Sequence, residues 1–329
     1  MKLLAVGDLH VKHDNFEDID IVFNDLKKIY TEEKFEAIVL LGDILHHHEK
    51  VFTQSLNKAL DFIKKCSELG FTYILVGNHD MISNSQFLTD CHWMNVLKTC
   101  PNIKVVDTVI EVDNIILCPF VAPGRFIEAL DTLGINKWRD KKVIFAHQEF
   151  LGCQMGAIKS IDGDMWCEEY PMVISGHIHD TQSVGKVFYP GAPLQHGFGD
   201  SNKRIICSIN SSDENMSIVE HPIKVPKKHI IKTDIKNIGN VKDSKGLDKI
   251  KIKLDATQEE FKIFKDTNEY KELISKGVKF QLQKKESKTI GLGNVGDNFL
   301  KILEELVEED QVVKDLYYEI LCDRMVIEF

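Results

Sequence analysis

Five short motifs, far apart along the chain, contain side chains that bind divalent metal ions. They are Asp8-Leu9-His10, Gly42-Asp43, Gly77-Asn78-His79-Asp80, Ala146-His147 and Gly176-His177-Ile178-His179. Each follows a short run rich in Val, Ile and Leu, and such runs are typical of buried strands. Because ligands in layered α/β folds bind beyond the carboxyl ends of the strands, we expect these side chains to meet at one edge of a sheet.

Carboxylate, amide and imidazole donors together favour transition ions such as Mn, Fe, Co and Zn. Two such ions about 3.5–4 Å apart can neutralise the attacking and leaving oxygens of a phosphoryl transfer. We predict that Asp43 bridges the two ions, since a carboxylate is the ligand best able to do so. The other predicted ligands form two sets: Asp8, His10 and His179 for one ion, and Asn78, His147 and His177 for the other. The negative charges of two carboxylates only partly neutralise two divalent ions, so the site keeps a net charge of about +2 that can attract a phosphate.

The third motif also contains candidate catalytic residues that need not bind metal. His79 follows the predicted ligand Asn78, so it is placed to contact the phosphate or to protonate the leaving oxygen. We expect Asp80 to orient the His79 imidazole, as carboxylates next to metal sites often do.

In these five motifs the chain resembles the calcineurin-like metallophosphoesterase superfamily. That superfamily has the pattern Asp-x-His, Gly-Asp, Gly-Asn-His-Asp/Glu, His and Gly-His-x-His, and all five motifs occur in order across residues 8–179. Within it, the chain looks most like the SbcD-type DNA nucleases, which include the meiotic-recombination-eleven enzymes and a tailed-phage recombination nuclease. Residues 189–193 and 198–200 resemble that family's Tyr-Pro-Gly-Ser-x and Phe-x-Glu stretches, with Ala192 and Asp200 as departures.

The resemblance implies more than the residues alone do. His46 falls where many members have a histidine that supports the catalytic one. Mn²⁺ is the implied metal, and the implied activity is exonucleolytic cleavage of double-stranded DNA from 3′ ends, with single-strand endonuclease activity. The implied partner in recombination and repair is an SMC-like coiled-coil ABC ATPase of the SbcC type. A homodimer is compatible with the resemblance.

Charge is unevenly distributed along this chain of 329 residues, whose net charge is −10. Residues 1–221 contain 20 basic and 31 acidic side chains, residues 222–290 contain 18 and 10, and residues 291–329 contain 3 and 10. A basic block beside a phosphoesterase site is where a polyanion would bind, although lysine-rich segments are often only solvated. We therefore predict a metallophosphoesterase (nuclease) domain over 1–221, a capping or DNA-contacting domain over 222–290, and C-terminal helices over 291–329.

The pattern of apolar residues predicts an α/β fold. Helices are expected at Phe16–Ile29 and Thr53–Leu69, and mostly short strands follow, which fits a four-layer α/β/β/α sandwich; the resemblance implies the same fold. The basic block predicts a small α+β unit with strands at Ile230–Ile235, Ile250–Leu254 and Val278–Leu282. Its helix begins near Thr257, where Glu260 completes a capping box.

Several alternatives remain open. The apolar stripe within residues 297–329 predicts a helix pair that docks either on its own core or on the ATPase. A small-molecule phosphoesterase acting on cyclic nucleotides or nucleotide pyrophosphates is the alternative to the nuclease, and a non-catalytic scaffold is disfavoured by the complete ligand set. No apolar stretch reaches the roughly 20 residues of a membrane helix, so we expect no membrane association and an intracellular, cytoplasmic location (host cytoplasm for a viral protein). The remaining histidines receive no role: His13, His47, His48, His92, His196, His221 and His229.

Overall fold

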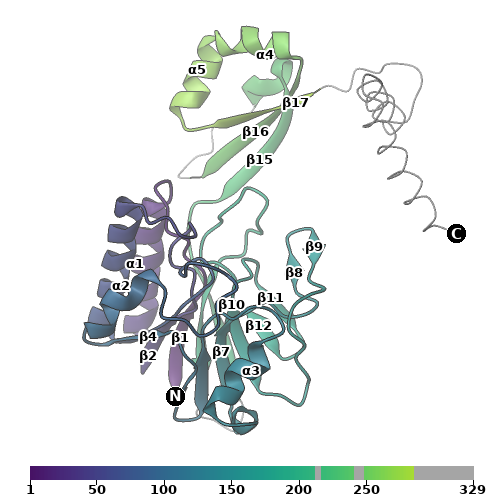
Figure 1. Ribbon diagram of the computed structural model, residues 1–329. Coiled ribbons are helices and arrows are strands. Elements are labelled where there is room, and N and C mark those ends of the chain that lie inside the picture. The colour runs from purple at the N-terminus through teal and green to yellow at the C-terminus, as the bar shows by residue number, and fades with distance from the viewer. Residues whose placement is uncertain (212–215, 241–247, 285–329) are drawn as a thin grey trace, which may run out of the picture.

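The computed structural model describes residues 1–211, 216–240 and 248–284, which form two six-stranded sheets, a three-stranded sheet and a two-stranded hairpin (Figure 1). The first large sheet has, in spatial order, β14 (Ser217–Pro222), β13 (Ile205–Asn210), β1 (Lys2–Val6), β2 (Ala37–Leu40), β3 (Phe71–Leu75) and β4 (Ile103–Val106). The second has β11 (Gln182–Val184), β12 (Val187–Tyr189), β10 (Met172–Gly176), β7 (Val143–His147), β6 (Ile115–Cys118) and β5 (Ile110–Val112).

Parallel pairing brings the ends of the motif-bearing strands together. In the first sheet β1, β2, β3 and β4 are parallel neighbours, and in the second β6, β7, β10 and β12 are. The five apolar runs predicted as strands correspond to β1, β2, β3, β7 and β10, which confirms that part of the interpretation. Because parallel strands all point the same way, their carboxyl ends, and the motifs that follow, lie at one edge of each sheet.

Alternating side chains join the sheets and helices into layers. Leu4 and Val6 of β1 pack under the helices α1 (Phe16–Glu32) and α2 (Thr53–Leu69). Leu3 and Ala5 point the other way and pack against Phe145 of the second sheet, as the two-residue period of a strand requires. The outer face of the second sheet is covered by α3 (Phe126–Leu130) and by short 3-10 helices. This α/β/β/α arrangement, called here the sandwich, confirms the predicted fold class.

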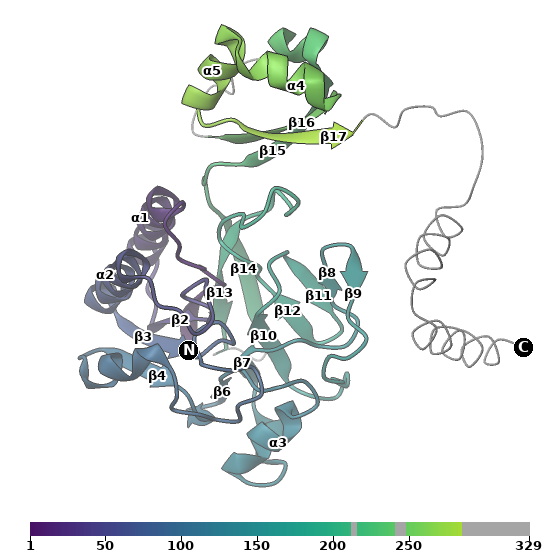
Figure 2. The ribbon, with the colours of Figure 1, turned by 45° about the horizontal axis from the view of Figure 1, so that its top comes forward.

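Shorter elements complete the sandwich. They are the 3-10 helices η1 (Trp93–Thr99), η2 (Asp131–Leu133) and η3 (Lys137–Asp140), and a hairpin of β8 (Gln154–Met155) and β9 (Ile158–Lys159). The hairpin lies between β7 and β10 in the chain, and Gln154 of β8 forms hydrogen bonds with Gln182 of β11, beside which it lies (Figure 2).

A smaller unit follows the sandwich and is called here the small sheet. It contains the parallel strands β15 (Lys228–Asp234), β16 (Lys249–Ala256) and β17 (Lys279–Lys284), with η4 (Ile235–Asn240), α4 (Gln258–Lys265) and α5 (Asn268–Ser275). The predicted capping box of α4 is present: Thr257 Oγ1 accepts from Glu260 N, and Thr257 N donates to Glu260 Oε2. Ile252, Leu254 and Phe264 form its own apolar core.

Two predictions are not tested by these findings. The division at residues 221 and 290 stays a prediction, and the C-terminal helices expected over 291–329 lie outside the described residues. Across the described part of the chain, no helix is both long enough and apolar enough to cross a bilayer.

Candidate metal centre

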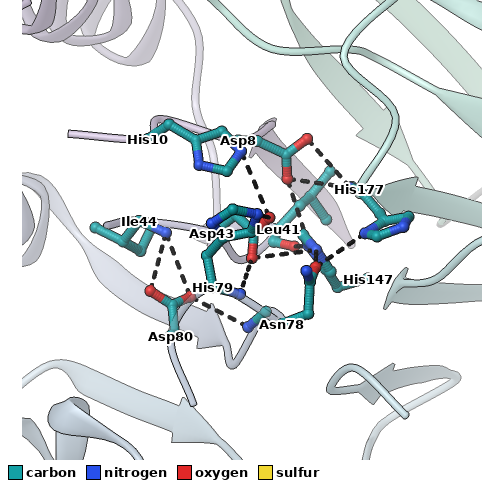
Figure 3. Close-up of polar contacts among 12 residues, drawn as sticks. Asp8, His10, Leu41, Asp43, Ile44, Asn78, His79, Asp80, His147 and His177 are labelled. Carbon is teal, nitrogen blue, oxygen red and sulfur yellow. Dashed lines mark hydrogen bonds and ion pairs between the residues drawn. The ribbon is translucent and has the colours of Figure 1, made fainter. Parts of the chain in front are cut away.

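The candidate ligands gather where the carboxyl ends of the two sheets meet (Figure 3). The Asp43 carboxylate lies between two imidazoles, with Oδ2 3.5 Å from His10 Nε2 and Oδ1 3.3 Å from His147 Nε2. On the first side, His179 Nε2 lies 3.1 Å from His10 Nε2. On the second side, Asn78 Oδ1 lies 3.0 Å from His147 Nε2. This arrangement is the one expected if Asp43 bridges two ions.

Of the remaining predicted ligands, His177 joins its predicted group, whereas the Asp8 carboxylate contacts His147 and His177 and not the predicted partners His10 and His179. His177 Nδ1 lies 2.9 Å from Asn78 Oδ1, on the second side. Asp8 Oδ1 lies 3.4 Å from His147 Nδ1, and both Asp8 oxygens accept from the backbone N–H of His177 at 3.1 Å. The sequence separation of 169 residues between Asp8 and His177 shows that only the folded sandwich assembles the site.

The charges in this site fit bound cations. Asp8 and Asp43 are buried, with 0% and 1% of their surface exposed, and burying two carboxylates together is unfavourable unless positive charge neutralises them. Burial raises the pKa of Asp8. Burial alone would lower the pKa of His147, but Asp43 and Asp8 raise it to about 9, so the site attracts a proton where a cation would bind. The donor set therefore fits divalent transition ions.

Backbone contacts orient the candidate ligands. His147 Nδ1 lies 2.7 Å from the Leu41 carbonyl, which leaves Nε2 facing Asp43 and Asn78; such a contact fixes the ring and its tautomer. Asn15 Nδ2 donates to the carbonyl of His10 at 3.0 Å. His10, Asp43 and His177 have φ values of 42°, 50° and 81°, a left-handed conformation that costs energy for residues other than glycine and is common at functional sites.

Two motif glycines are required by close packing. A Cβ on Gly77 would lie 2.2 Å from Asp43 Oδ1, and one on Gly176 would lie 2.8 Å from Asp8 Oδ1. Real Cβ atoms essentially never come within 3.0 Å of another atom. These glycines therefore let the backbone pass directly beside the two carboxylates.

His79 lies at the open side of the centre. Its side chain is 24% exposed, and its Nε2 is 4.0 Å from Asp43 Oδ2. Its Nδ1 lies 2.6 Å from the carbonyl of His46, and its ring packs against that of His48, with centroids 3.7 Å apart and planes tilted by 35°. The position suits contact with a substrate phosphate or leaving group.

The predicted contact of Asp80 with His79 is absent, whereas His46 does contact His79. Asp80 does not contact the His79 imidazole; its carboxylate accepts from the backbone of Ile44, Leu45 and Gly77 and from Trp93 Nε1. Consecutive residues on a turn point in different directions, so Asp80 holds the loop that follows Asp43. His46 contacts His79 through its backbone carbonyl, and the two rings are near-parallel with centroids 6.1 Å apart.

His196 received no role from the sequence, yet it packs against the first group of ligands. Its ring centroid is 4.6 Å from that of His10 and 4.8 Å from that of His179. One imidazole nitrogen from each of these three residues lies within 4.8 Å of the others.

The only sequence signal for His196 was its place between the stretches 189–193 and 198–200. A second missed residue, Glu149, has Oε2 3.8 Å from His177 Nε2.

Comparison with known proteins agrees with this geometry. The family described as calcineurin-like phosphoesterase matches residues 1–181. Candidate phosphoesterase 244L of Invertebrate iridescent virus 6 is 41% identical over 274 residues, covering 80% of this chain and 97% of that protein. Candidate phosphoesterase 078R of Invertebrate iridescent virus 3 is 36% identical over 332 residues, covering 98% and 95%.

Solved structures resemble the chain more distantly. YfcE, a phosphoesterase from E. coli, is 12% identical with a TM-score of 0.33, and the match covers 68% of this chain and 100% of that one. A hypothetical protein from Thermus thermophilus is 10% identical with a TM-score of 0.36, covering 68% and 100%.

Proposed function

This chain belongs to the calcineurin-like phosphoesterase family, and we propose that it is a nuclease that cleaves phosphodiester bonds in DNA. Family membership makes it a metal-dependent phosphoesterase. The choice of DNA as substrate, and of the SbcD-type subfamily, is our proposal. One observation supports it above all: a lysine-rich surface of the small sheet adjoins the metal centre.

That surface, called here the lysine face, arises because buried apolar residues and lysines alternate along β16. In β16, Ile250, Ile252 and Leu254 are buried under α4 and α5, so the lysines between them lie on the opposite side of the sheet. Neighbouring strands add lysines in register with these, and the face comprises Lys228, Lys232, Lys249, Lys251, Lys253 and Lys279. Because the helices cover the other side, the lysine face is turned toward the sandwich (Figure 2).

Direct contacts join this face to a loop beside the metal centre and to the first turn of α1. Lys228 Nζ donates to the carbonyl of His196 at 3.0 Å, and Lys249 Nζ lies 2.8 Å from Asp18 Oδ2 at the start of α1. Farther along, Lys232 and Lys279 are exposed. A row of cations leading to a phosphoesterase centre suits the repeated phosphates of a nucleic acid.

The residues of the centre have separable roles in such a reaction. Bound divalent cations would supply Lewis acidity and an activated water, with Mn²⁺ as the ion that the resemblance implies. Asp43 would hold both ions, Asp8, His10 and His179 one of them, and Asn78, His147 and His177 the other. His79, fixed at Nδ1 by the His46 carbonyl, presents Nε2 to the open side, where an imidazolium can donate a proton to the leaving oxygen.

The experiment that tests this proposal compares two substrates. Linear double-stranded DNA and bis-p-nitrophenyl phosphate are incubated with the full chain and Mn²⁺, with Asp43→Asn as the inactive control. Reversing Lys232, Lys253 and Lys279 to Glu should reduce DNA cleavage by more than about a hundredfold, since several phosphate contacts are lost together, and should reduce diester turnover far less. The matched control reverses three exposed lysines away from the face, Lys236, Lys262 and Lys271.

Intact DNA with rapid turnover of the small diester would overturn the nuclease proposal and favour the small-molecule phosphoesterase. Equal losses on both substrates would show that the lysine face does not select DNA. The SMC-like ATPase partner stays a prediction from the resemblance, because the tail that would bind it, residues 291–329, lies outside the described residues.

A further inference from the structure

The loop from Gln195 to Asp200 connects the small sheet to the metal centre. At one end, His196 Nε2 lies 3.1 Å from the carbonyl of Asp8, and its ring packs on those of His10 and His179. The other ring nitrogen of His196, Nδ1, is buried without a hydrogen-bond partner in the described part of the chain. The His196 ring therefore supports His10 and His179 by packing against their rings, and it contacts the backbone of Asp8.

The same loop is fixed internally by Asp200. Its Oδ2 accepts from the backbone N–H of His196 at 2.7 Å and from that of Gly197 at 2.9 Å. Gln195 Nε2 donates to the Asp200 carbonyl at 2.9 Å. These hydrogen bonds hold residues 195–200 in one compact turn. A shift of this turn would therefore also move the His196 ring.

The small sheet holds this turn at two positions with cations of the lysine face. Lys228 donates twice, from its backbone N to Gln195 Oε1 at 2.7 Å and from Nζ to the His196 carbonyl at 3.0 Å. Lys251 Nζ lies 4.9 Å from the centre of the Phe198 ring, within range of a cation–π contact. The sheet thus contacts both His196 itself and residues on either side of it.

We propose that His196 is a positioning residue of the metal centre and that Lys228 of the small sheet holds it in place. The path runs from Lys228 through the His196 backbone to its ring, and from that ring to the rings of His10 and His179. The His196 contact with Asp8 is to the backbone carbonyl, and the Asp8 carboxylate is held separately by the N–H of His177. The second group, Asn78, His147 and His177, has its own supports at Leu41 and Glu149. Loss of Lys228 should therefore disturb one ion site and spare the other.

The test measures Mn²⁺ binding to the metal-stripped full chain by isothermal titration calorimetry, together with kcat and KM for bis-p-nitrophenyl phosphate. Removing a partner that orients metal ligands typically costs about 10–100-fold in affinity or activity. Lys228→Ala should weaken one of the two Mn²⁺ sites by about tenfold, leave the other unchanged, and lower kcat more than it raises KM. Lys228→Arg, which keeps the charge and can still donate to the carbonyl, should restore most of the lost affinity.

Two further variants make the result decisive. Lys236→Ala removes an exposed lysine just beyond β15 and should change neither ion site. His196→Ala should weaken the same ion site as Lys228→Ala, and in the double variant the losses should be less than additive. Unchanged affinity of both sites in Lys228→Ala would overturn the proposal, as would equal weakening of the two.

The outcome is independent of the substrate proposed above. Both readouts use Mn²⁺ and a small diester, so a protein that does not cleave DNA can still support the link between Lys228 and His196. Conversely, a proven nuclease whose Lys228→Ala variant binds Mn²⁺ normally would refute only the link.

Discussion

The metal centre and the lysine face are built in opposite ways. Side chains of the centre are positioned by particular neighbours, such as Leu41 beside His147 and Gly77 beside Asp43. The lysine face arises from alternation along β16, and its exposed lysines could be exchanged for one another. We infer that chemistry requires each residue of the centre, whereas attraction of a polyanion requires only a sufficient number of charges. The predictions below test that difference.

The largest effect is expected at Asp43. Its two oxygens face His10 and His147 separately, so Asp43→Asn should disrupt both ion sites at once. Turnover of bis-p-nitrophenyl phosphate should fall by more than about a hundredfold, beyond the range for groups that only orient ligands, and bound Mn²⁺ measured by plasma mass spectrometry should fall with it. Chelation of the wild-type protein should have the same effect. Asp61→Asn, at an exposed pair with Lys65 on α2, is the control.

The next largest effect should separate chemistry from metal binding. His79→Ala removes a ring at the open side of the centre that is not among the predicted ligands. Turnover should fall by about 10²–10⁴-fold, as for loss of a general acid or base, with Mn²⁺ content close to that of wild type. A variant that has also lost its metal would show that His79 belongs to the ligand set.

A moderate effect is expected where packing alone maintains the centre. Gly77→Ala adds one carbon that would lie 2.2 Å from Asp43 Oδ1, so the loop or the carboxylate must shift. We expect about a 10–100-fold loss of Mn²⁺ affinity, the range for misplaced ligands. Gly124→Ala is the matched control: its φ is +84° but nothing lies within 4 Å of the added carbon. It should cost about 1–2 kcal/mol of stability without changing metal affinity.

The same contrast explains what could be predicted from sequence. Strands, helices and the capping box at Thr257 follow from local patterns, and the motifs at the strand ends were sufficient to predict that Asp8 and His177 meet at one site. His196 was missed because its role depends on a contact with Asp8 across 188 residues, and a single histidine in a loop has no periodic signal. Asp80 was misassigned because adjacency to His79 suggested a contact that the turn geometry prevents.

The smallest effect should come from one lysine of the face. Lys253→Ala removes one charge among several, and each phosphate contact contributes about 0.9 to the slope of log affinity against log salt. We expect DNA affinity, measured by fluorescence anisotropy without a divalent ion, to fall less than about tenfold, with the slope reduced by about one. The effects of Lys253→Ala and Lys232→Ala should add. A loss from Lys253→Ala alone as large as that from Asp43→Asn would mean that the lysine face, too, depends on individual residues, and the distinction between the two regions would not hold.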